Sequence, residues 1–262
     1  MSSERTARAE AEEANRAKDT FLAMVTHELR APLNTILGWT NMLGKGTLDA
    51  EKTKHAVAVI ERGAKTQARL VEDLLDISRI RTGKFRVSAQ PVELSAVFEA
   101  AVESVAPSIA AKQIILHKDF GERVGLISGD AERLQQVVWN LLSNAVKFTP
   151  EKGQIEIRLE RANHHARLTV YDNGAGIRRE FLPFVFDSFR QSEESDTAKR
   201  KGLGLGLAIV RHLVEAHGGT VTATSAGENL GATFTVELPL LAPQAQSNER
   251  PASRNEASLE YV

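Results

Sequence analysis

A histidine on the polar side of a predicted helix is the first group in this chain that could do chemistry. His27 lies in the segment FLAMVTHELRAPLNTILGW, and its neighbours include Glu28, Arg30 and Pro32. At about 100° per residue, the apolar side chains of this segment fall on one side of the helix and His27 falls on the other, facing water. An isolated helical histidine is more often structural. Here a proline inside the helix predicts a local kink, and a water-facing imidazole beside a carboxylate can act as a nucleophile or base.

Three later segments carry polar or glycine-rich patterns that could bind an anion. Asn140 and Asn144 lie four residues apart in RLQQVVWNLLSNAVKFT, so both amides share one face of a predicted helix. Taken alone, such a pair is equally consistent with a polar surface. In VYDNGAGI, Asp172 follows a predicted strand, and Gly174 and Gly176 permit turn conformations that other residues avoid. Taken alone, this segment is an ordinary turn.

The third pattern is KGLGLGLAIVRHLVEAHGG, where Gly202, Gly204 and Gly206 precede an amphipathic helix. Bare backbone amides near a helix N-terminus can bind phosphate. The spacing does not fit the dinucleotide pattern G-x-G-x-x-G. We interpret His217, at the end of the helix, as a structural residue.

The elements that position these groups differ between the two parts of the chain. Residues 3 to about 80 are rich in helix-forming residues and are interrupted at Gly44–Lys52, which predicts an all-α helical hairpin in which Thr47 or Asp49 caps the second helix. The apolar stripe of the second helix is too wide for one hairpin to cover, so we expect a homodimer that forms a four-helix bundle. After about residue 84, short β-branched runs alternate with helical stretches near 95–111, 131–147 and 205–217. This pattern predicts an α+β sandwich with helices on one sheet face.

Composition excludes several classes of protein. The 262 residues contain no cysteine, which excludes disulfides and thiolate metal sites, and the net charge of −1 with scattered lysines does not favour nucleic-acid binding. No apolar run approaches the roughly 20 residues of a membrane span, and the charged N-terminus is unlike a signal peptide. We expect a soluble, cytoplasmic chain with a polar tail or linker at 241–262.

The motif H-E-L-R-x-P-L around His27, followed in order by the asparagine, Asp-x-Gly and glycine-rich segments, resembles the core of the sensor histidine kinases. The resemblance covers about residues 15–240. It implies a HisKA-type dimerisation and phosphotransfer domain at 19–83 and a HATPase_c ATP-binding domain of the GHKL (Bergerat) type at 84–240. It also implies that residues 1–18 form a coiled-coil connector helix from a sensor domain that lies outside this chain.

The resemblance implies an enzyme that uses Mg·ATP to phosphorylate its own histidine. His27 would attack the γ-phosphate, and Glu28 would orient the ring. Asn140 would ligate Mg²⁺ with support from Asn144, and Lys147 would contact phosphate. The phosphoryl group would then pass to an aspartate in the receiver domain of a response regulator.

Further roles in the ATP site follow from the same resemblance. Asp172 would accept the adenine amino group, beside Gly174 and Gly176. The segment FLPFVFDSFRQSEESDTAKRK resembles the F-box and ATP lid, with Phe189 and Arg190 as candidate contacts and 199–201 as weaker ones. The glycines at 202, 204 and 206 would lie against phosphate.

One position departs from the commonest family pattern, because Ala31 stands where Thr or Asn often helps to dephosphorylate the partner. We therefore expect weak phosphatase activity. Two other hypotheses stay open: a GHKL-fold ATPase or serine kinase, which would lack a histidine-bearing hairpin, and a non-catalytic dimeric signalling scaffold, which would not need Asn140, Asp172 or the glycines.

Overall fold

The computed structural model describes residues 2–121, 124–190 and 203–241, with side chains described from residue 23 onward. Gly202, the basic residues 199–201 and the tail from 242 lie outside the described residues. The helices are α1 Ser2–Gly44, α2 Ala50–Arg81, α3 Leu94–Ala111, α4 Ala131–Phe148 and α5 Gly206–Ala216, with a short 3₁₀ turn at Leu182–Phe184. The strands are β1 Gln90–Glu93, β2 Ile115–Phe120, β3 Leu126–Gly129, β4 Gln154–Ala162, β5 His165–Asp172, β6 Thr220–Thr224 and β7 Ala232–Pro239.

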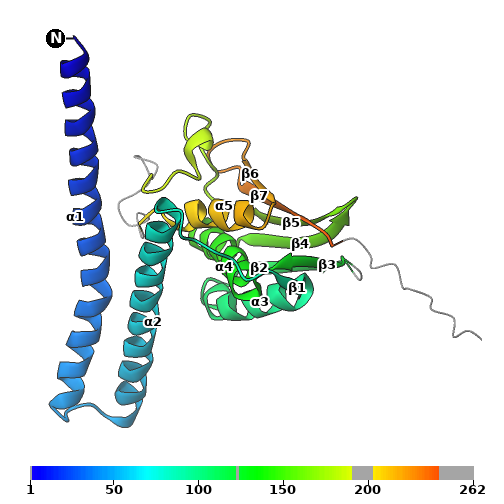
Figure 1. Cartoon of the computed structure of the whole chain (residues 1–262). Helices are drawn as coiled ribbons and strands as arrows, with labels where there is room; N and C mark the ends of the chain where they lie inside the picture. The colour runs from blue at the N-terminus through cyan, green and yellow to red at the C-terminus, as the bar shows by residue number, and fades with distance from the viewer. Residues whose placement is uncertain (1, 122–123, 191–202, 242–262) are drawn as a thin grey trace, which may run out of the picture.

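The first two helices form the predicted hairpin (Figure 1). Gly46 adopts a left-handed conformation (φ 65°) in the turn. Asp49 caps α2, because its carboxylate accepts a hydrogen bond of 2.8 Å from the backbone N–H of Lys52. Helix α1 continues through Pro32 as a single helix, so the proline does not divide it. At the other end, α2 ends at Arg81, and Gly83 just after it has a φ of 64°, a conformation that glycine adopts without strain.

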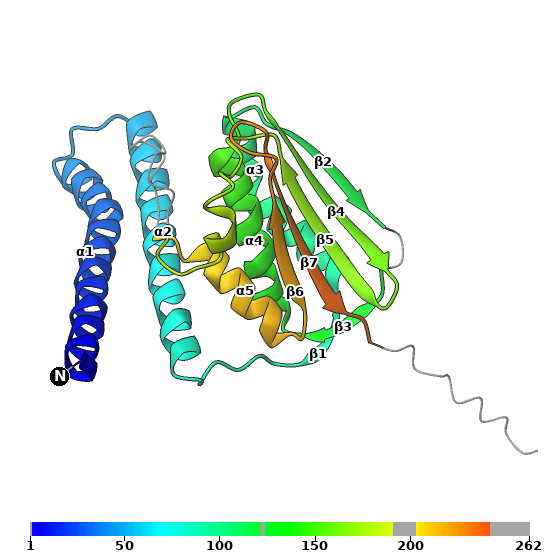
Figure 2. The same cartoon turned by 90° about the horizontal axis from the view of Figure 1, so that it is seen from above.

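The second part of the chain is a five-stranded sheet covered on one face by α3, α4 and α5 (Figure 2). The strand order is β2-β4-β5-β7-β6; β2 pairs with β4 in parallel and the other neighbours are antiparallel. Alternate residues of β4, β5 and β7 are buried, as a sheet with one covered face requires. A separate ladder joins β1 to β3. The predicted sandwich after a helical hairpin is confirmed.

Helix α3 is the one described helix that is long and apolar enough, by length and composition alone, to cross a membrane. Its side chains nevertheless contribute to the core of the second domain, where Leu94, Phe98 and Ala101 are almost completely buried. A core helix of this kind passes the same test of length and hydropathy.

The hairpin is packed on the second domain through α2. Both views place α2 between α1 and the helical layer of the sandwich (Figures 1 and 2). Ile77 of α2 is 6% exposed and belongs to the same apolar cluster as the core of α4 and α5. The apolar residues Val57, Val71 and Leu75 of α2 stay exposed on the single chain.

Candidate functional site

Asp172 lies at the floor of the candidate site because of the alternation along β5. Ala166, Leu168 and Val170 point into the core, and Asp172 continues that series with 3% of its surface exposed. Its Oδ1 accepts the backbone N–H of Gly174 at 2.9 Å. Burial raises the pKa of Asp172, against the lowering effect of backbone hydrogen bonds from Gly174 and Ala232. The carboxylate is thus a buried acceptor with lone pairs to spare.

The turn after Asp172 is locked to the end of α4. Ala175 donates its backbone N–H to the carbonyl of Phe148 at 3.2 Å. A Cβ atom at Gly174 would collide with this same carbonyl, and one at Gly176 would collide with the carbonyl of Gly227. Gly176 also has a φ of 66°. Close backbone approach therefore explains both glycines, and it joins the Asp172 turn to the last turn of α4.

The two asparagines of α4 differ in exposure. Asn140 is 5% exposed, and its Nδ2 has no hydrogen-bond partner among the residues that the structure describes. Its Oδ1 faces Gly206 at the start of α5, 3.3 Å from where a Cβ would lie. Asn144 is half-buried, one turn closer to the Asp172 turn. A buried amide that lacks a partner needs an explanation, such as a bound water, a bound ion or a catalytic role.

Lys147 joins this site to the hairpin. Burial lowers its pKa, and the charge of Glu28 on α1 acts in the opposite direction. Its Nζ lies 4.6 Å from the centre of the Phe148 ring. The carboxylate beside His27 is therefore close enough to affect the last turn of α4, although the two residues are far apart in the sequence.

The glycine-rich segment and the aromatic segment meet at the start of α5. Phe189 donates its backbone N–H to the carbonyl of Gly204 at 3.1 Å, and both residues have positive φ. A side chain at Gly204 would press on the carbonyl of Arg190. The exposed guanidinium of Arg190 lies 4.1 Å from the centre of the Phe184 ring and 3.7 Å from Asp187. The two segments that were predicted to bind phosphate therefore contact each other.

His27 is exposed, as predicted. Its side chain is 82% exposed, and Nδ1 lies 3.6 Å from Oε1 of Glu28. This separation permits a charge interaction but is too long for a hydrogen bond. Met24 and Val25, in the turn before His27, pack against the apolar core. The helix therefore buries one side and presents the imidazole to water on this single chain.

His217 is structural, as predicted from its place at a helix end. Its Nδ1 lies 2.6 Å from the carbonyl of Leu213, and its Nε2 accepts the backbone N–H of Asp130 at 3.0 Å. The proton is therefore on Nδ1. His217 joins the end of α5 to the start of α4 and takes no part in the site.

Two polar residues that support the site were not singled out from the sequence. Asn173 accepts the backbone N–H of Gln154 through Oδ1 at 2.8 Å. The hydroxyl of Ser225 accepts the backbone N–H of Ile177 at 3.0 Å. Ser225 also donates to the carbonyl of Gly231 at 2.6 Å. The Asp-Asn-Gly signal could have identified Asn173, because asparagine often fixes such turns. Nothing local identifies Ser225, whose partners are distant in sequence.

Comparison with known families divides the chain where its architecture changes. Residues 17–83 match HisKA, the His Kinase A (phospho-acceptor) domain. Residues 129–242 match HATPase_c, described as a histidine kinase-, DNA gyrase B-, and HSP90-like ATPase. His27 lies in the first match and Asp172 in the second.

Individual relatives show the same combination. The chain is 38% identical to hybrid signal transduction histidine kinase D of Dictyostelium discoideum over 87% of its own length, and it spans 18% of that protein. The structure of full-length ShkA in complex with AMPPNP is 29% identical, with a TM-score of 0.61 over 84% of this chain and 45% of that one. The structure of histidine kinase ThkA in complex with response regulator protein TrrA is 23% identical, with a TM-score of 0.56 over 89% and 66% of the two chains. The last likeness shows the fold alone.

Proposed function

The chain belongs to the sensor histidine kinases, of which it has the HisKA plus HATPase_c core, and we propose that it phosphorylates His27 from Mg·ATP. The phosphoryl group then passes to an aspartate in the receiver domain of a response regulator. One observation carries the proposal: an exposed histidine lies beside Glu28, whose charge reaches Lys147 at the end of α4. ThkA, which shares the fold of this chain, is recorded in complex with response regulator protein TrrA.

The second domain binds the nucleotide in this proposal. Asp172 accepts the adenine amino group at the pocket floor, where its buried carboxylate has free lone pairs. Lys147 and Arg190 contact phosphate, and Phe189 holds the aromatic segment against Gly204. The bare backbone at Gly204 and Gly206 approaches the phosphates at the start of α5. AMPPNP in the ShkA complex supports a nucleotide at this fold.

The asparagine pair fits a magnesium ion that accompanies ATP. Asn140 and Asn144 lie on one face of α4, and a neutral amide oxygen suits a hard cation already paired with phosphate. The unpartnered Nδ2 of the buried Asn140 favours a role for that side chain besides packing. When bound, Mg²⁺ would neutralise charge on the phosphates. We propose that the two amides act together, with Asn144 the more accessible of the two.

His27 attacks the γ-phosphorus through Nε2, because Nδ1 is the ring nitrogen nearer to Glu28. The N–P bond forms as the bond between the γ-phosphorus and the oxygen of ADP breaks. Glu28 orients the ring and stabilises the positive charge that develops on it. Ala31 is exposed and offers no polar side chain to hold a water, so kinase and phosphodonor activity exceeds phosphatase activity.

We infer the domain limits and setting from the same reasoning. Residues 1–18 form a connector helix, 19–83 the dimerisation and phosphotransfer domain, and 84–240 the ATP-binding domain. The tail from 241 is a linker or an extension. The kinase core works in the cytoplasm, where ATP and response regulators are found, and it receives its signal through α1.

Incubation with γ-labelled ATP tests the function directly. The kinase forms an acid-labile, base-stable label on His27. A GHKL-type ATPase releases phosphate without labelling the chain, and a scaffold does neither. Mixing an Asn140→Ala chain with a His27→Gln chain then tells whether labelling runs within or between subunits, because only transfer between subunits restores the label.

We predict that the chain is a homodimer and that the exposed face of α2 lies in the interface. Val57, Val71 and Leu75 are 53, 42 and 50% exposed, and their spacing places them within about 40° on one helix face. Burying one such side chain contributes about 1.5–3 kcal/mol. Val71→Glu should therefore raise the dimer dissociation constant at least about tenfold in sedimentation equilibrium.

The control for the dimer is Arg62→Glu, which introduces the same side chain on another face of α2 and should leave the dissociation constant unchanged. A wild-type chain that sediments only as a monomer at micromolar concentration would exclude the interface.

A further inference from the structure

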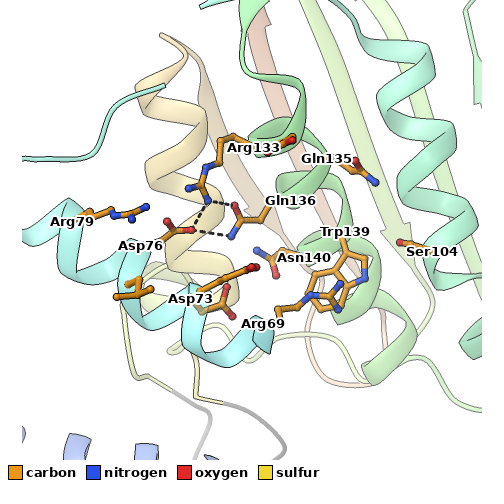
Figure 3. Close-up of a pocket in the computed structure, with 13 residues that line it drawn as sticks. Arg69, Asp73, Asp76, Arg79, Ser104, Arg133, Gln135, Gln136, Trp139 and Asn140 are labelled. Carbon is orange, nitrogen blue, oxygen red and sulfur yellow. Dashed lines mark hydrogen bonds and ion pairs between the residues drawn. The ribbon is translucent and has the colours of Figure 1, made fainter. Parts of the chain in front are cut away.

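A polar contact between α2 and α4 surrounds a cavity of about 430 Å³ (Figure 3). Asp76 of α2 is 2% exposed, and its Oδ2 lies 2.6 Å from Nη1 of Arg133. Gln136 donates to the same oxygen at 3.1 Å, and Arg133 donates to Gln136 at 2.9 Å. One buried carboxylate from the hairpin is therefore held by two side chains from the ATP-binding domain.

Further contacts hold the same two helices together. The guanidinium of Arg69 lies 3.4 Å from the centre of the Trp139 ring, so it stacks across the helix boundary. Arg133 lies 5.4 Å from the centre of the Phe85 ring in the connection between the domains. The next part of this connection is tied to the start of α4, where Ser88 donates its backbone N–H to Asp130 at 3.2 Å.

We propose that Asp76 is a positioning residue, which holds Arg133 and Gln136 so that the nucleotide end of α4 faces His27. The proposal rests on the function given above. Asp76 touches neither ATP nor His27 and acts through α4. It would set the rate of phosphoryl transfer and leave the affinity for ATP unchanged.

The length of α4 explains how a distant ion pair can position the site. Its 18 residues span about 27 Å. Arg133 and Gln136 lie in its first half, and Asn144 and Lys147 lie near its end. Because a helix is rigid, fixing the first half to α2 fixes the direction of the second half, where Glu28 acts on Lys147. Phosphoryl transfer depends strongly on such alignment.

Variants of this contact keep their fold, because its partners belong to different domains. When α2 and α4 are in contact, which we call the docked state, loss of one partner leaves a buried charge unpaired, and this is strongly unfavourable. Separation of the two domains returns that charge to water. The expected response is undocking of the ATP-binding domain.

Asp73, one turn before Asp76, makes the contact sensitive to pH. Burial raises the pKa of Asp73 to about 6, and the charge of Asp76 adds to this, while Arg69 and a hydrogen bond from Gln136 act in the opposite direction. The docked state therefore binds a proton more tightly than an exposed aspartate does. Docking is favoured at low pH and weakens as pH rises through about 6. The charged side chains that face this position come from both helices: Arg69, Glu72, Asp76 and Arg79 of α2, and Glu132 and Arg133 of α4.

Three variants of the full chain test the proposal: Asp76→Asn, Arg133→Gln and the charge exchange Asp76→Arg with Arg133→Asp. We expect kcat for autophosphorylation to fall at least about tenfold in each single variant, with KM for ATP unchanged. The charge exchange should recover a substantial part of kcat, which a merely structural role would not allow. Arg158→Gln is the control, because Arg158 has two carboxylate partners on the sheet, Asp119 at 3.2 Å and Glu156 at 2.8 Å.

A distance measurement between spin labels on α2 and on the outer face of β4 supplies a readout that does not depend on the reaction. The distribution of distances should be broader in the single variants than in the wild type at the same pH, and it should narrow again in the charge exchange. Asp73→Asn should keep the narrow distribution at pH 8, where the wild type is broader, and should match the wild type at pH 5. An unchanged or raised kcat, or a distribution unaffected by Asp76→Asn, would overturn the positioning role. A wild type that docks but does not label His27 would instead overturn the proposed function.

Discussion

Replacing His27 by glutamine should abolish transfer of label from γ-labelled ATP to the chain, a loss of at least about 10³-fold. Glutamine is close to histidine in size and keeps hydrogen-bonding groups, but its amide nitrogen has no lone pair available for attack. The His27 side chain is 82% exposed, so the substitution removes no core contact. Nucleotide affinity and the thermal midpoint of unfolding should therefore stay at wild-type values.

His212→Gln is a matched control for this prediction. His212 lies on α5 with Nδ1 3.7 Å from a carboxylate oxygen of Glu215, a geometry like that of His27 and Glu28. The His212 side chain is 39% exposed and should carry no label. The His212→Gln chain should therefore be labelled as strongly as the wild type. Acid-labile label that persists in His27→Gln would show that another residue is the phospho-acceptor.

The helical hairpin and the sheet could be predicted because their signals are local. Residues of one helix or strand determine its periodicity, so the exposure of His27 and the alternation of β5 follow from short stretches of sequence. The sequence placed Asp172 just after the strand, whereas β5 extends to Asp172, which is the last buried residue of its alternating series. The cap by Asp49 also depends on residues that are close in the chain.

The contacts between the domains could not be predicted, because they depend on how two separately folded parts meet. Asp76 is 57 residues from Arg133, and no periodicity links them. Within α2, Asp76 interrupts an apolar stripe and could be interpreted as a solvated position, yet it is 2% exposed. The influence of Glu28 on Lys147 has the same origin. Sequence motifs identify the groups that react and bind, while docking determines whether they meet.

Asn140 and Asn144 show that residue spacing within one helix predicts a shared face but does not predict burial. Their spacing correctly placed both on one face of α4, but it did not distinguish their surroundings. Asn140 faces Gly206 and the contact with α2, whereas Asn144 is half-buried nearer to the Asp172 turn. The difference arises from α2 and α5, which cover the two positions unequally.

Replacing Asp172 by asparagine should weaken ATP binding about 10²- to 10⁴-fold in a titration with a fluorescent ATP analogue. The carboxylate accepts the backbone N–H of Gly174 and still has lone pairs for the adenine amino group. Asparagine has one oxygen and directs an NH₂ group at a donor, either the backbone or the adenine. A lost hydrogen bond to a charged acceptor costs about 1.5–3 kcal/mol, and an unsatisfied buried donor costs about 1–3 kcal/mol more.

A purine nucleoside triphosphate without the amino group gives the sharpest control, because it should lose much less affinity than ATP in the variant. Asp119 of β2 is a 65% exposed carboxylate, and the Asp119→Asn chain should bind ATP like the wild type.

The pH dependence of ATP affinity separates the effect of the Asp172 charge from the effect of its shape. Because burial raises the pKa of Asp172, the wild type should lose ATP affinity as pH falls through that raised value, when the carboxylate gains a proton. The asparagine variant has no such proton to gain, so its weak affinity should not change over the same range. An ATP affinity in Asp172→Asn equal to that of the wild type would mean that the adenine amino group is bound elsewhere.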